Sequence, residues 1–387
     1  MSAYPAGINF TIKFRDRLTS ARAGEIRIGN EVIETPFFMP VATYGFVKGI
    51  PFPLLKQMGY KCVIFSTFHL MMRPGIEKIK LLGGISGLTG WDGLVATDSG
   101  GFQIFSLSEH IQVSEDKIEF RSPVDGSKIV ITPEKIIEAQ LDMGSNFVMP
   151  LDVCSAYPVS REVALRELQQ TLKWFEKCYL CFMNRKREGS TLFYIIQGSI
   201  YEDLRIEAIK AAEKYDTGGY AAGGLGVGEP PEQTYKIARH ISSHLPEDKP
   251  RYAMGIGYIH DIIKLVSYGY DMFDCVLPTR NGRNGQLLMP LSRVNFRNSE
   301  YALKKETFSI FVKRFNSWDI PFCALHHSFK INDMTGPLLA SLHNLLLYQK
   351  TIDAIKYHIK NGTFSEMVRV VEQNMPEKLM EYILIAG

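Results

Sequence analysis

Short apolar runs alternate with longer amphipathic stretches along the chain from Phe37 onward. Apolar runs of this kind indicate buried strands, and stretches with helical spacing supply the crossover that two parallel strands require. Helix-start signals precede three of these stretches, at Thr132-Pro133, Ser160 and Pro230-Pro231. The pattern predicts an α/β protein with a parallel (β/α)8 barrel of the TIM type. The eight runs cover residues 37–42, 62–67, 94–97, 146–151, 192–197, 219–224, 251–255 and 272–277.

Three regions depart from the alternation and make the predicted barrel irregular. Gly29-Asn30 separates the runs 25–28 and 31–34, which predicts an N-terminal hairpin over one end of the barrel. Residues 107–132 hold short alternating runs and predict an antiparallel insertion after the third strand. Helical patterns dominate near the C-terminus. We therefore expect a barrel with insertions over residues 1–298 and a C-terminal helical subdomain packed on it over residues 299–387.

Composition indicates a globular protein, because 387 residues with 45% hydrophobic content are enough for a large core. A net charge of +3 does not by itself indicate a nucleic-acid partner, but residues 277–314 contain eight Lys or Arg and two Glu. The N-terminus lacks a signal-peptide layout and no apolar run reaches membrane-spanning length, so we expect a cytoplasmic protein with no membrane partner. No Walker or dinucleotide-binding motif implies a nucleotide cofactor.

The six cysteines show no disulfide spacing, and we expect them to be reduced. Only Cys178 and Cys181 have the separation of a metal-binding pair. They lie in a helical pattern without a second pair nearby. Two packed thiols are therefore favoured over a metal or redox site.

Polar residues follow the apolar runs, and the carboxyl ends of parallel barrel strands all meet at one mouth. Three carboxylates gathered there repel one another unless a ligand or a reaction requires them, so this set indicates a functional site. The residues expected at the strand ends are Thr67, Phe68, His69, Asp98, Ser99, Gly100, Gly101, Phe102, Gln103, Asp152, Gln197, Gly198, Gly223, Gly224, Leu225, Gly255 and Asp274.

The stretch FDCVLPTRNGRNG, residues 273–285, combines a carboxylate at the end of a strand with a basic segment. The apolar neighbours of Asp274 predict a strand that ends at Pro278, followed by tight glycine turns. Arg280 and Arg283 supply two guanidinium groups suited to phosphates or base edges. A nucleophilic carboxylate beside an RNA-binding segment is one hypothesis. The alternative is that Asp274 caps a helix or pairs with Arg280.

The hydrogen-bond donors and acceptors expected at the mouth are complementary to those on the edge of guanine. A carboxylate such as Asp152 accepts from N1 and the 2-amino group, whereas O6 requires a donor such as the Gln197 amide or a backbone N–H near Gly224. Phe102 and Met254 could cover the two faces of an extruded base. Both are also compatible with ordinary core positions.

Together these segments resemble the bacterial type of tRNA-guanine transglycosylase, from about Phe14 to Leu346. Members of that family exchange guanine at wobble position 34 of tRNAs with G-U-N anticodons (Asp, Asn, His, Tyr) for a 7-deazaguanine, by way of a covalent Asp–ribose intermediate. The resemblance implies the barrel fold, a tRNA anticodon loop and a 7-deazaguanine base as substrates, a homodimer and no catalytic cofactor. It rests on MPVATYGFVKG, STFHLMMRPG, DSGGFQIFSL, PLDVCSAYP, IIQG, GGLGVGE, MGIG, FDCVLPTRNGRNG and LASLHNL.

The resemblance also implies roles for individual residues. Asp274 matches the nucleophile, and Asp98 matches the general acid/base. The base-binding positions are Ser99, Gly100, Gly101, Phe102, Asp152, Gln197, Gly224, Leu225 and Met254. The positions expected to hold the anticodon loop are Gly255, Ile256, Gly257, Tyr258, Ile259, His260, Thr279, Arg280, Asn281, Gly282 and Arg283.

The chain departs from the family pattern at the structural zinc site. Three cysteine positions of the family fall on Val312, Arg314 and Ser317, and only His343 is retained. We therefore expect no bound zinc. The apolar residues of 308–322, Trp318 among them, are expected to replace the metal by forming a buried plug, with His343 as a packed histidine.

Two questions remain open from the sequence. Gly226 leaves room for a larger 7-substituent such as that of queuine, whereas Val227 favours 7-aminomethyl-7-deazaguanine. A non-catalytic tRNA-binding subunit is the main alternative to an enzyme, and the retained Asp98 and Asp274 argue against it. A glycoside hydrolase would explain two carboxylates but not the guanine-like set.

Overall fold

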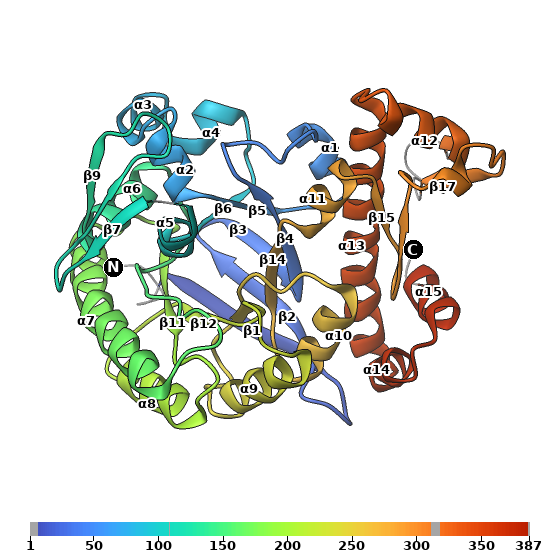
Figure 1. Ribbon diagram of the computed structural model, residues 1–387. Coiled ribbons are helices and arrows are strands. Elements are labelled where there is room, and N and C mark those ends of the chain that lie inside the picture. Colours follow the sequence, from blue (N-terminus) through green and yellow to red (C-terminus); the bar gives the residue numbers. More distant parts are fainter. Residues whose placement is uncertain (1–6, 108, 311–317, 386–387) are drawn as a thin grey trace.

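The computed structural model describes residues 7–107, 109–310 and 318–385, and its centre is a closed barrel of eight parallel strands (Figure 1). Each strand pairs with its neighbour in the chain order, and the last strand pairs with the first through Asp274 and Met39. The predicted barrel is confirmed. Its strands are β4 (Phe37–Ala42), β5 (Cys62–Phe65), β6 (Leu94–Thr97), β10 (Phe147–Val148), β11 (Thr191–Ile196), β12 (Gly219–Ala222), β13 (Arg251–Ala253) and β14 (Met272–Cys275).

Helices cover the outside of the barrel between the strands. Two predicted helix starts carry side-chain caps, since Thr132 accepts from the Lys135 N–H and Ser160 accepts from the Val163 N–H. The helices are α1 (Phe52–Gln57), α2 (Thr67–Met72), α3 (Ile76–Leu81), α4 (Gly84–Thr89), α5 (Gly101–Leu107), α6 (Pro133–Asp142), α7 (Arg161–Arg185), α8 (Glu202–Ala212), α9 (Pro231–Ser243), α10 (Ile259–Ser267) and α11 (Leu277–Arg283).

An antiparallel sheet closes the amino-terminal end of the barrel. It consists of β1 (Ile8–Arg15), β2 (Arg22–Ile28) and β3 (Glu31–Thr35), and the predicted hairpin is its β2–β3 half. Ile8, Ile26 and Ile33 pack in one cluster with the side chains that fill the barrel interior. The hairpin therefore serves as the cover that was expected, with β1 as an additional strand.

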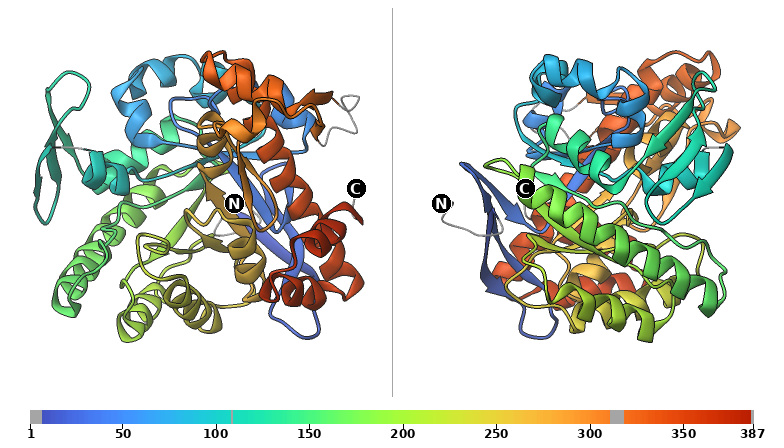
Figure 2. Two further views of the ribbon diagram at one scale, coloured as in Figure 1. Left: turned by 45° about the vertical axis from the view of Figure 1, so that its right-hand side comes forward. Right: turned by 90° about the vertical axis from the view of Figure 1, so that its left-hand side faces the viewer.

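The predicted insertion after the third strand is also present, as β7 (Glu109–Val113), β8 (Ile118–Arg121) and β9 (Lys128–Ile131). It stands out from the barrel, at the end opposite to the N-terminal sheet (Figure 2). Its first turn is held to α7, because the Glu115 carbonyl accepts from Gln170 Nε2 and from Trp174 Nε1.

The segment after β14 differs from its prediction. The strand ends at Cys275, and residues 277–283 form α11 where we expected glycine turns. Pro278 lies at the start of α11, a position that proline favours. A Cβ on Gly282 would come within 2.5 Å of the Ser341 nitrogen. The glycine thus serves close helix packing, a role that the local sequence did not reveal.

The C-terminal part is mostly helical, as expected, and its longest helix takes the place of an eighth barrel helix. Helix α13 (Thr335–Asn361) runs beside α11, β4 and α10 (Figure 1). Tyr60 Oη donates to the Leu345 carbonyl at 2.7 Å, and Tyr348 Oη donates to the Gly257 carbonyl. The other elements are β15 (Gln286–Leu288), β16 (Arg293–Asn295), a 3-10 turn at Ser299–Tyr301, β17 (Thr307–Ile310), β18 (Trp318–Pro321), α12 (Phe322–Lys330), α14 (Phe364–Glu372) and α15 (Pro376–Ile385).

One continuous core joins side chains of the barrel and of α13, so the proposed division at residue 298 stays a prediction. Cys178 is buried with its Sγ directed at the Pro133 carbonyl, and Cys181 Sγ is directed at the Glu134 carbonyl. Both thiols thus face backbone carbonyls of α6, and their assignment as packed thiols stays a prediction. Within the described ranges, no helix combines the length and apolar character needed to cross a bilayer.

Candidate active site

The candidate residues stand at the carboxyl ends of six barrel strands and so face one mouth. Asp98 directly follows β6, Asp152 follows β10 and Gln197 follows β11. Gly224 and Leu225 lie just after β12, Met254 and Gly255 come directly after β13, and Asp274 is the third residue of β14. The closed order of the strands therefore brings together residues that lie far apart in the chain.

Asp274 is held through one of its two carboxylate oxygens. Oδ1 accepts from Tyr252 Oη at 2.6 Å and from the Gly255 N–H at 2.8 Å. Among the described residues, no hydrogen bond falls on Oδ2. Burial raises the pKa of Asp274, and the two hydrogen bonds lower it. The result is a fixed carboxylate with one open oxygen, which is the arrangement a nucleophile requires.

Asp98 lies close enough to Asp274 for the two charges to interact. Burial, together with the smaller effect of the Asp274 charge, raises the pKa of Asp98 to about 7, although the hydrogen bond from the Thr67 N–H lowers it. Oδ1 accepts from the Thr67 N–H at 2.8 Å, and Oδ2 accepts from Gln103 Nε2 at 3.1 Å. A carboxyl group that titrates near neutrality can both give and take a proton, as a general acid/base must.

Asp152 and Gln197 form a buried pair. Asp152 Oδ2 accepts from Gln197 Nε2 at 2.6 Å, while Oδ1 accepts from Ser99 Oγ at 3.1 Å. The amide nitrogen that we assigned to guanine O6 thus already donates to Asp152, and its second N–H is left for a ligand. Gln197 Oε1 is buried and has no hydrogen-bond partner in the described part of the chain. Such an atom is costly to bury unless a bound molecule satisfies it.

Two glycines let the backbone after β12 approach Gln197. A Cβ on Gly223 would lie 2.5 Å from Gln197 Nε2, and one on Gly224 would lie 2.8 Å from Oε1. Gly224 also has a φ of +62°, a conformation that other residues rarely adopt. Larger residues at these positions would displace the amide from Asp152.

Three residues that support the site were not predicted from the sequence. The buried guanidinium of Arg205 donates to the carbonyls of Ser199, Ile196 and Gly223 and so fixes the ends of β11 and β12. The carboxylate of Glu229 accepts from the N–H groups of Gly226 and Val227. Tyr252 is the third. The sequence around Arg205 and Glu229 does not distinguish them from other polar residues. Tyr252 could have been found, because the alternation of side chains along β13 turns it toward the barrel interior.

The two expected stacking residues differ in exposure. Phe102 is 55% exposed at the start of α5, which contradicts the core alternative for this residue. Met254 is partly buried against the barrel interior. A base placed between them remains an expectation.

The expected RNA-binding residues divide into exposed and buried groups. Arg280 and Tyr258 are exposed, and the rings of Tyr258 and His260 stack at 5.5 Å. Arg283 is half-buried, and its pKa is lowered by burial and by the charge of Arg280. No carboxylate of the described chain pairs with either arginine. The buried residues of the set are Ile256, Gly257, Ile259, Thr279, Asn281 and Gly282.

The chain is similar to known proteins along most of its length. A family model described as "Queuine tRNA-ribosyltransferase" matches residues 16–377. The chain belongs to this family. A relative of that name from Acinetobacter baylyi is 40% identical over 348 residues, covering 90% of each chain. One from Marinobacter nauticus is 42% identical over 355 residues, covering 90% of this chain and 92% of its own.

The residues at the expected zinc positions are poor zinc ligands in this chain. The three expected thiolate positions, Val312, Arg314 and Ser317, lie outside the described residues, and none of these residue types is a usual zinc ligand. His343 is fully buried in α13, and its Nε2 donates to the Leu288 carbonyl at 3.0 Å. His343 is thus packed in the core here, and its lack of a metal stays a prediction. No metal-binding group of three His, Cys, Asp or Glu occurs within the described ranges.

The expected apolar plug is described only at its edges, because the side chains of residues 308–319, with Trp318, fall outside the described set. At the C-terminal edge, Phe322 lies 5.6 Å from the ring of Tyr301 and 5.7 Å from that of Phe296. Phe296 is fully buried. The plug itself, and the lack of zinc, stay predictions.

Proposed function

We propose that this protein is a tRNA-guanine transglycosylase, a pentosyltransferase that exchanges guanine at the wobble position of tRNAs with G-U-N anticodons for a 7-deazaguanine. The observation that carries this proposal is the pairing at the barrel mouth of Asp274, whose Oδ2 is open, with Asp98, whose pKa is near 7. Membership of the queuine tRNA-ribosyltransferase family supports it.

In the first half of the reaction, Asp274 Oδ2 attacks C1′ of the wobble nucleotide. The bond between C1′ and the guanine nitrogen breaks, a C1′–O bond to Asp274 forms, and Asp98 gives its proton to the departing base. In the second half, ionised Asp98 removes a proton from the incoming base, whose nitrogen attacks C1′ and releases Asp274. Two displacements retain the configuration at C1′, as in retaining glycosidases.

The base is held by the edge that Asp152 and Gln197 present. Their mutual hydrogen bond of 2.6 Å fixes the two groups relative to each other, and Ser99 holds the other oxygen of Asp152. Gly100, Gly101, Gly224 and Leu225 shape the pocket, with Phe102 and Met254 on the faces of the ring. The anticodon loop lies on Arg280, Arg283, Tyr258 and His260, whereas the buried members of the expected set support these residues from below.

The incoming base is either queuine or 7-aminomethyl-7-deazaguanine. Gly226 has a φ of +69°, and a Cβ there would meet only Ile256 Cδ1 at 3.4 Å. The glycine is therefore needed for the turn that Glu229 holds, as well as for the room it leaves. Side-by-side exchange assays with the two bases decide between them.

We also infer a homodimer in the cytoplasm, where tRNA is modified, with no zinc and no catalytic cofactor. The competing function is a tRNA-binding subunit without activity. It does not explain why both carboxylates keep the geometry of an acid/base and a nucleophile.

Incorporation of radiolabelled guanine into unmodified tRNA with a G-U-N anticodon tests the proposal. The matched control is the same tRNA with adenine at the wobble position. Incorporation into the first RNA alone supports the function. Binding of the tRNA without any incorporation would favour the non-catalytic subunit.

A further inference from the structure

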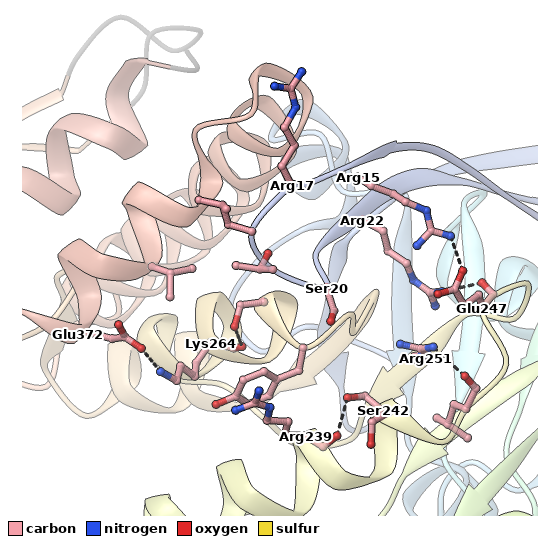
Figure 3. Close-up of a pocket in the computed structure, with 17 residues that line it drawn as sticks. Arg15, Arg17, Ser20, Arg22, Arg239, Ser242, Glu247, Arg251, Lys264 and Glu372 are labelled. Atoms are coloured by element: carbon pink, nitrogen blue, oxygen red, sulfur yellow. Dashed lines mark hydrogen bonds and ion pairs between the residues drawn. The ribbon is translucent and has the colours of Figure 1, made fainter.

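A basic pocket lies at the amino-terminal end of the barrel, away from the mouth that carries Asp98 and Asp274. Its volume is about 880 Å³, within the range of small-molecule sites. The walls come from the loop between β1 and β2, the ends of α9 and α10, the start of β13, and α14. Six Lys or Arg side chains line it, against the carboxylates of Glu247 and Glu372 (Figure 3).

Three of the six cations are engaged by acids. Arg22 makes a buried pair with Asp271 at 2.6 Å, Arg15 pairs with Glu247 at 2.8 Å, and Lys264 pairs with Glu372. The other three are Arg17, Arg239 and Arg251. Within the described ranges, no carboxylate lies at salt-bridge distance from any of them.

Only part of the Arg251 guanidinium is hydrogen-bonded within the described residues. Its Nη2 donates to the Leu245 carbonyl at 2.9 Å, but its Nε is buried without a hydrogen-bond partner among the described residues. The side chain as a whole is 6% exposed and lines the pocket. A buried N–H without a partner costs free energy, which a bound acceptor would recover. Gly269 makes this placement possible, because a Cβ there would lie 2.7 Å from Arg251 Nη1.

Arg239 reaches the same pocket from the residue before the last turn of α9. Its guanidinium lies over the ring of Tyr268 at 6.0 Å, which fixes its position without neutralising its charge. Figure 3 shows Arg239 and Arg251 on the same side of the pocket as Ser242, while Arg17 points away from them.

A structural explanation accounts for part of this charge. Helices α9 and α10 end at the pocket, and cations near a helix C-terminus stabilise its carbonyls. That effect covers Lys264 in the last turn of α10, whereas Arg239 precedes the last turn of α9. The effect does not cover Arg251, which belongs to a strand and keeps an unused N–H.

We propose that this basic pocket binds a small phosphorylated compound, whose phosphate oxygens accept from Arg239 and Arg251. Guanidinium groups from two elements match the several oxygens of a phosphate or diphosphate. The concave shape favours a small molecule over the convex backbone of an RNA duplex. Because the pocket is remote from the barrel mouth, its occupation is independent of the base-exchange proposal.

Calorimetric titration of the full-length protein at low salt with pyrophosphate, ADP and adenosine tests the proposal. We expect pyrophosphate and ADP to bind once per chain and adenosine not to bind. Tighter binding of ADP than of pyrophosphate would identify a nucleotide as the ligand, and equal binding would identify the phosphates alone. Both results support the pocket.

Arg239→Gln should weaken the binding by about tenfold or more, since it removes charge-assisted hydrogen bonds. Arg166→Gln, at an exposed arginine of α7, is the matched control and should change nothing. Ser20→Asp provides a second variant, because it adds a negative charge to the pocket without changing an arginine. Base exchange without ligand should be unchanged in all three.

Three results would overturn the proposal. The first is no binding of pyrophosphate or ADP by the parent protein. The second is binding that persists in both Arg239→Gln and Ser20→Asp but disappears in Arg280→Ala, which would place the anion at the RNA face. The third is weaker tRNA binding by Arg239→Gln together with no binding of the small phosphates, which would make this surface an RNA contact.

Discussion

The hydroxyl of Tyr252 donates to Asp274 Oδ1 across 2.6 Å inside the barrel, and the tyrosine itself is fully buried. Burial and the negative charge of Asp274 both raise the pKa of Tyr252, so the hydroxyl keeps its proton and remains a donor. The two strands β13 and β14 are neighbours, which makes this contact a property of the barrel itself. It fixes Oδ1 of Asp274 and leaves Oδ2 without a hydrogen bond from the described residues.

Tyr252→Phe should lower the rate of base exchange by about tenfold to a hundredfold, because a hydrogen bond to a charged group contributes roughly 1.5–3 kcal/mol. The same hydrogen bond lowers the pKa of Asp274. The variant should therefore reach its full rate at a higher pH than the parent, which a pH–rate profile measures. Tyr194→Phe is the control, because the Tyr194 hydroxyl is buried without a partner among the described residues. An unshifted profile in Tyr252→Phe would show that the tyrosine only fills space.

Asp274→Ala should reduce base exchange by at least about a thousandfold and leave tRNA affinity nearly unchanged, since it removes the nucleophile and spares the arginines. Denaturing gels should show a covalent tRNA adduct with the parent and none with the variant. Asp248→Ala, at an exposed acid, should behave like the parent. Persistence of the adduct in Asp274→Ala would assign the nucleophile to another residue.

Asp98 should make the folded protein less stable as the pH rises. Its folded pKa of about 7 exceeds the ordinary value, so the folded state binds more protons than the unfolded state between pH 4 and pH 7. The stability carried by this proton is present below about pH 4 and is lost as the pH rises through 7. The difference in unfolding free energy between Asp98→Asn and the parent should therefore favour the variant more at pH 8 than at pH 4. The change between the two pH values should be no more than about 4 kcal/mol.

Chemical denaturation at the two pH values measures that gain. Asp248→Asn serves as the reference variant, because its carboxylate is exposed. If Asp98→Asn shifted stability equally at both pH values, Asp98 would titrate as an ordinary carboxylate, and its role as a neutral-range acid would be in doubt.

Arg280→Ala and Arg283→Ala should each weaken tRNA binding and flatten its dependence on salt by about one unit of the log–log slope, because each phosphate contact releases counterions. Filter binding across a salt series measures both effects. Arg27→Ala, on the exposed face of β2, should leave the slope unchanged. An unaltered slope in both variants would mean that these arginines serve the protein's own structure.

Purified protein should contain well under one zinc per chain, and a strong chelator should leave its unfolding temperature unchanged. The reason is that residues 312, 314 and 317 provide no thiolate and that His343 Nε2 already donates to Leu288. Elemental analysis and a thermal melt check both statements. Stoichiometric zinc together with chelator-induced unfolding would show that other ligands rebuild the site.

The strands of the barrel and the residues at its mouth were predictable because both follow from short-range patterns. Each strand lies in a buried apolar run, polar residues stand at or after the ends of several of these runs, and a parallel barrel then brings those residues together. Helix α11 was not predictable, because Gly282 in its local sequence favours a turn. The reason for this glycine is its close contact with Ser341, which lies far along the chain. The pairing of Gln197 with Asp152 and the buried role of Arg205 likewise depend on contacts between distant segments.

Helix α13 also sets an order for the synthesis of the protein. The seam between β4 and β14 cannot form until the chain has passed residue 275, and α13 covers it only after residue 361. A nascent chain that ends between these points leaves the apolar surface beneath Leu345 and Tyr348 open to water. Most of the polypeptide must therefore leave the ribosome before the barrel is sealed, and a chaperone has its longest opportunity to act on this seam.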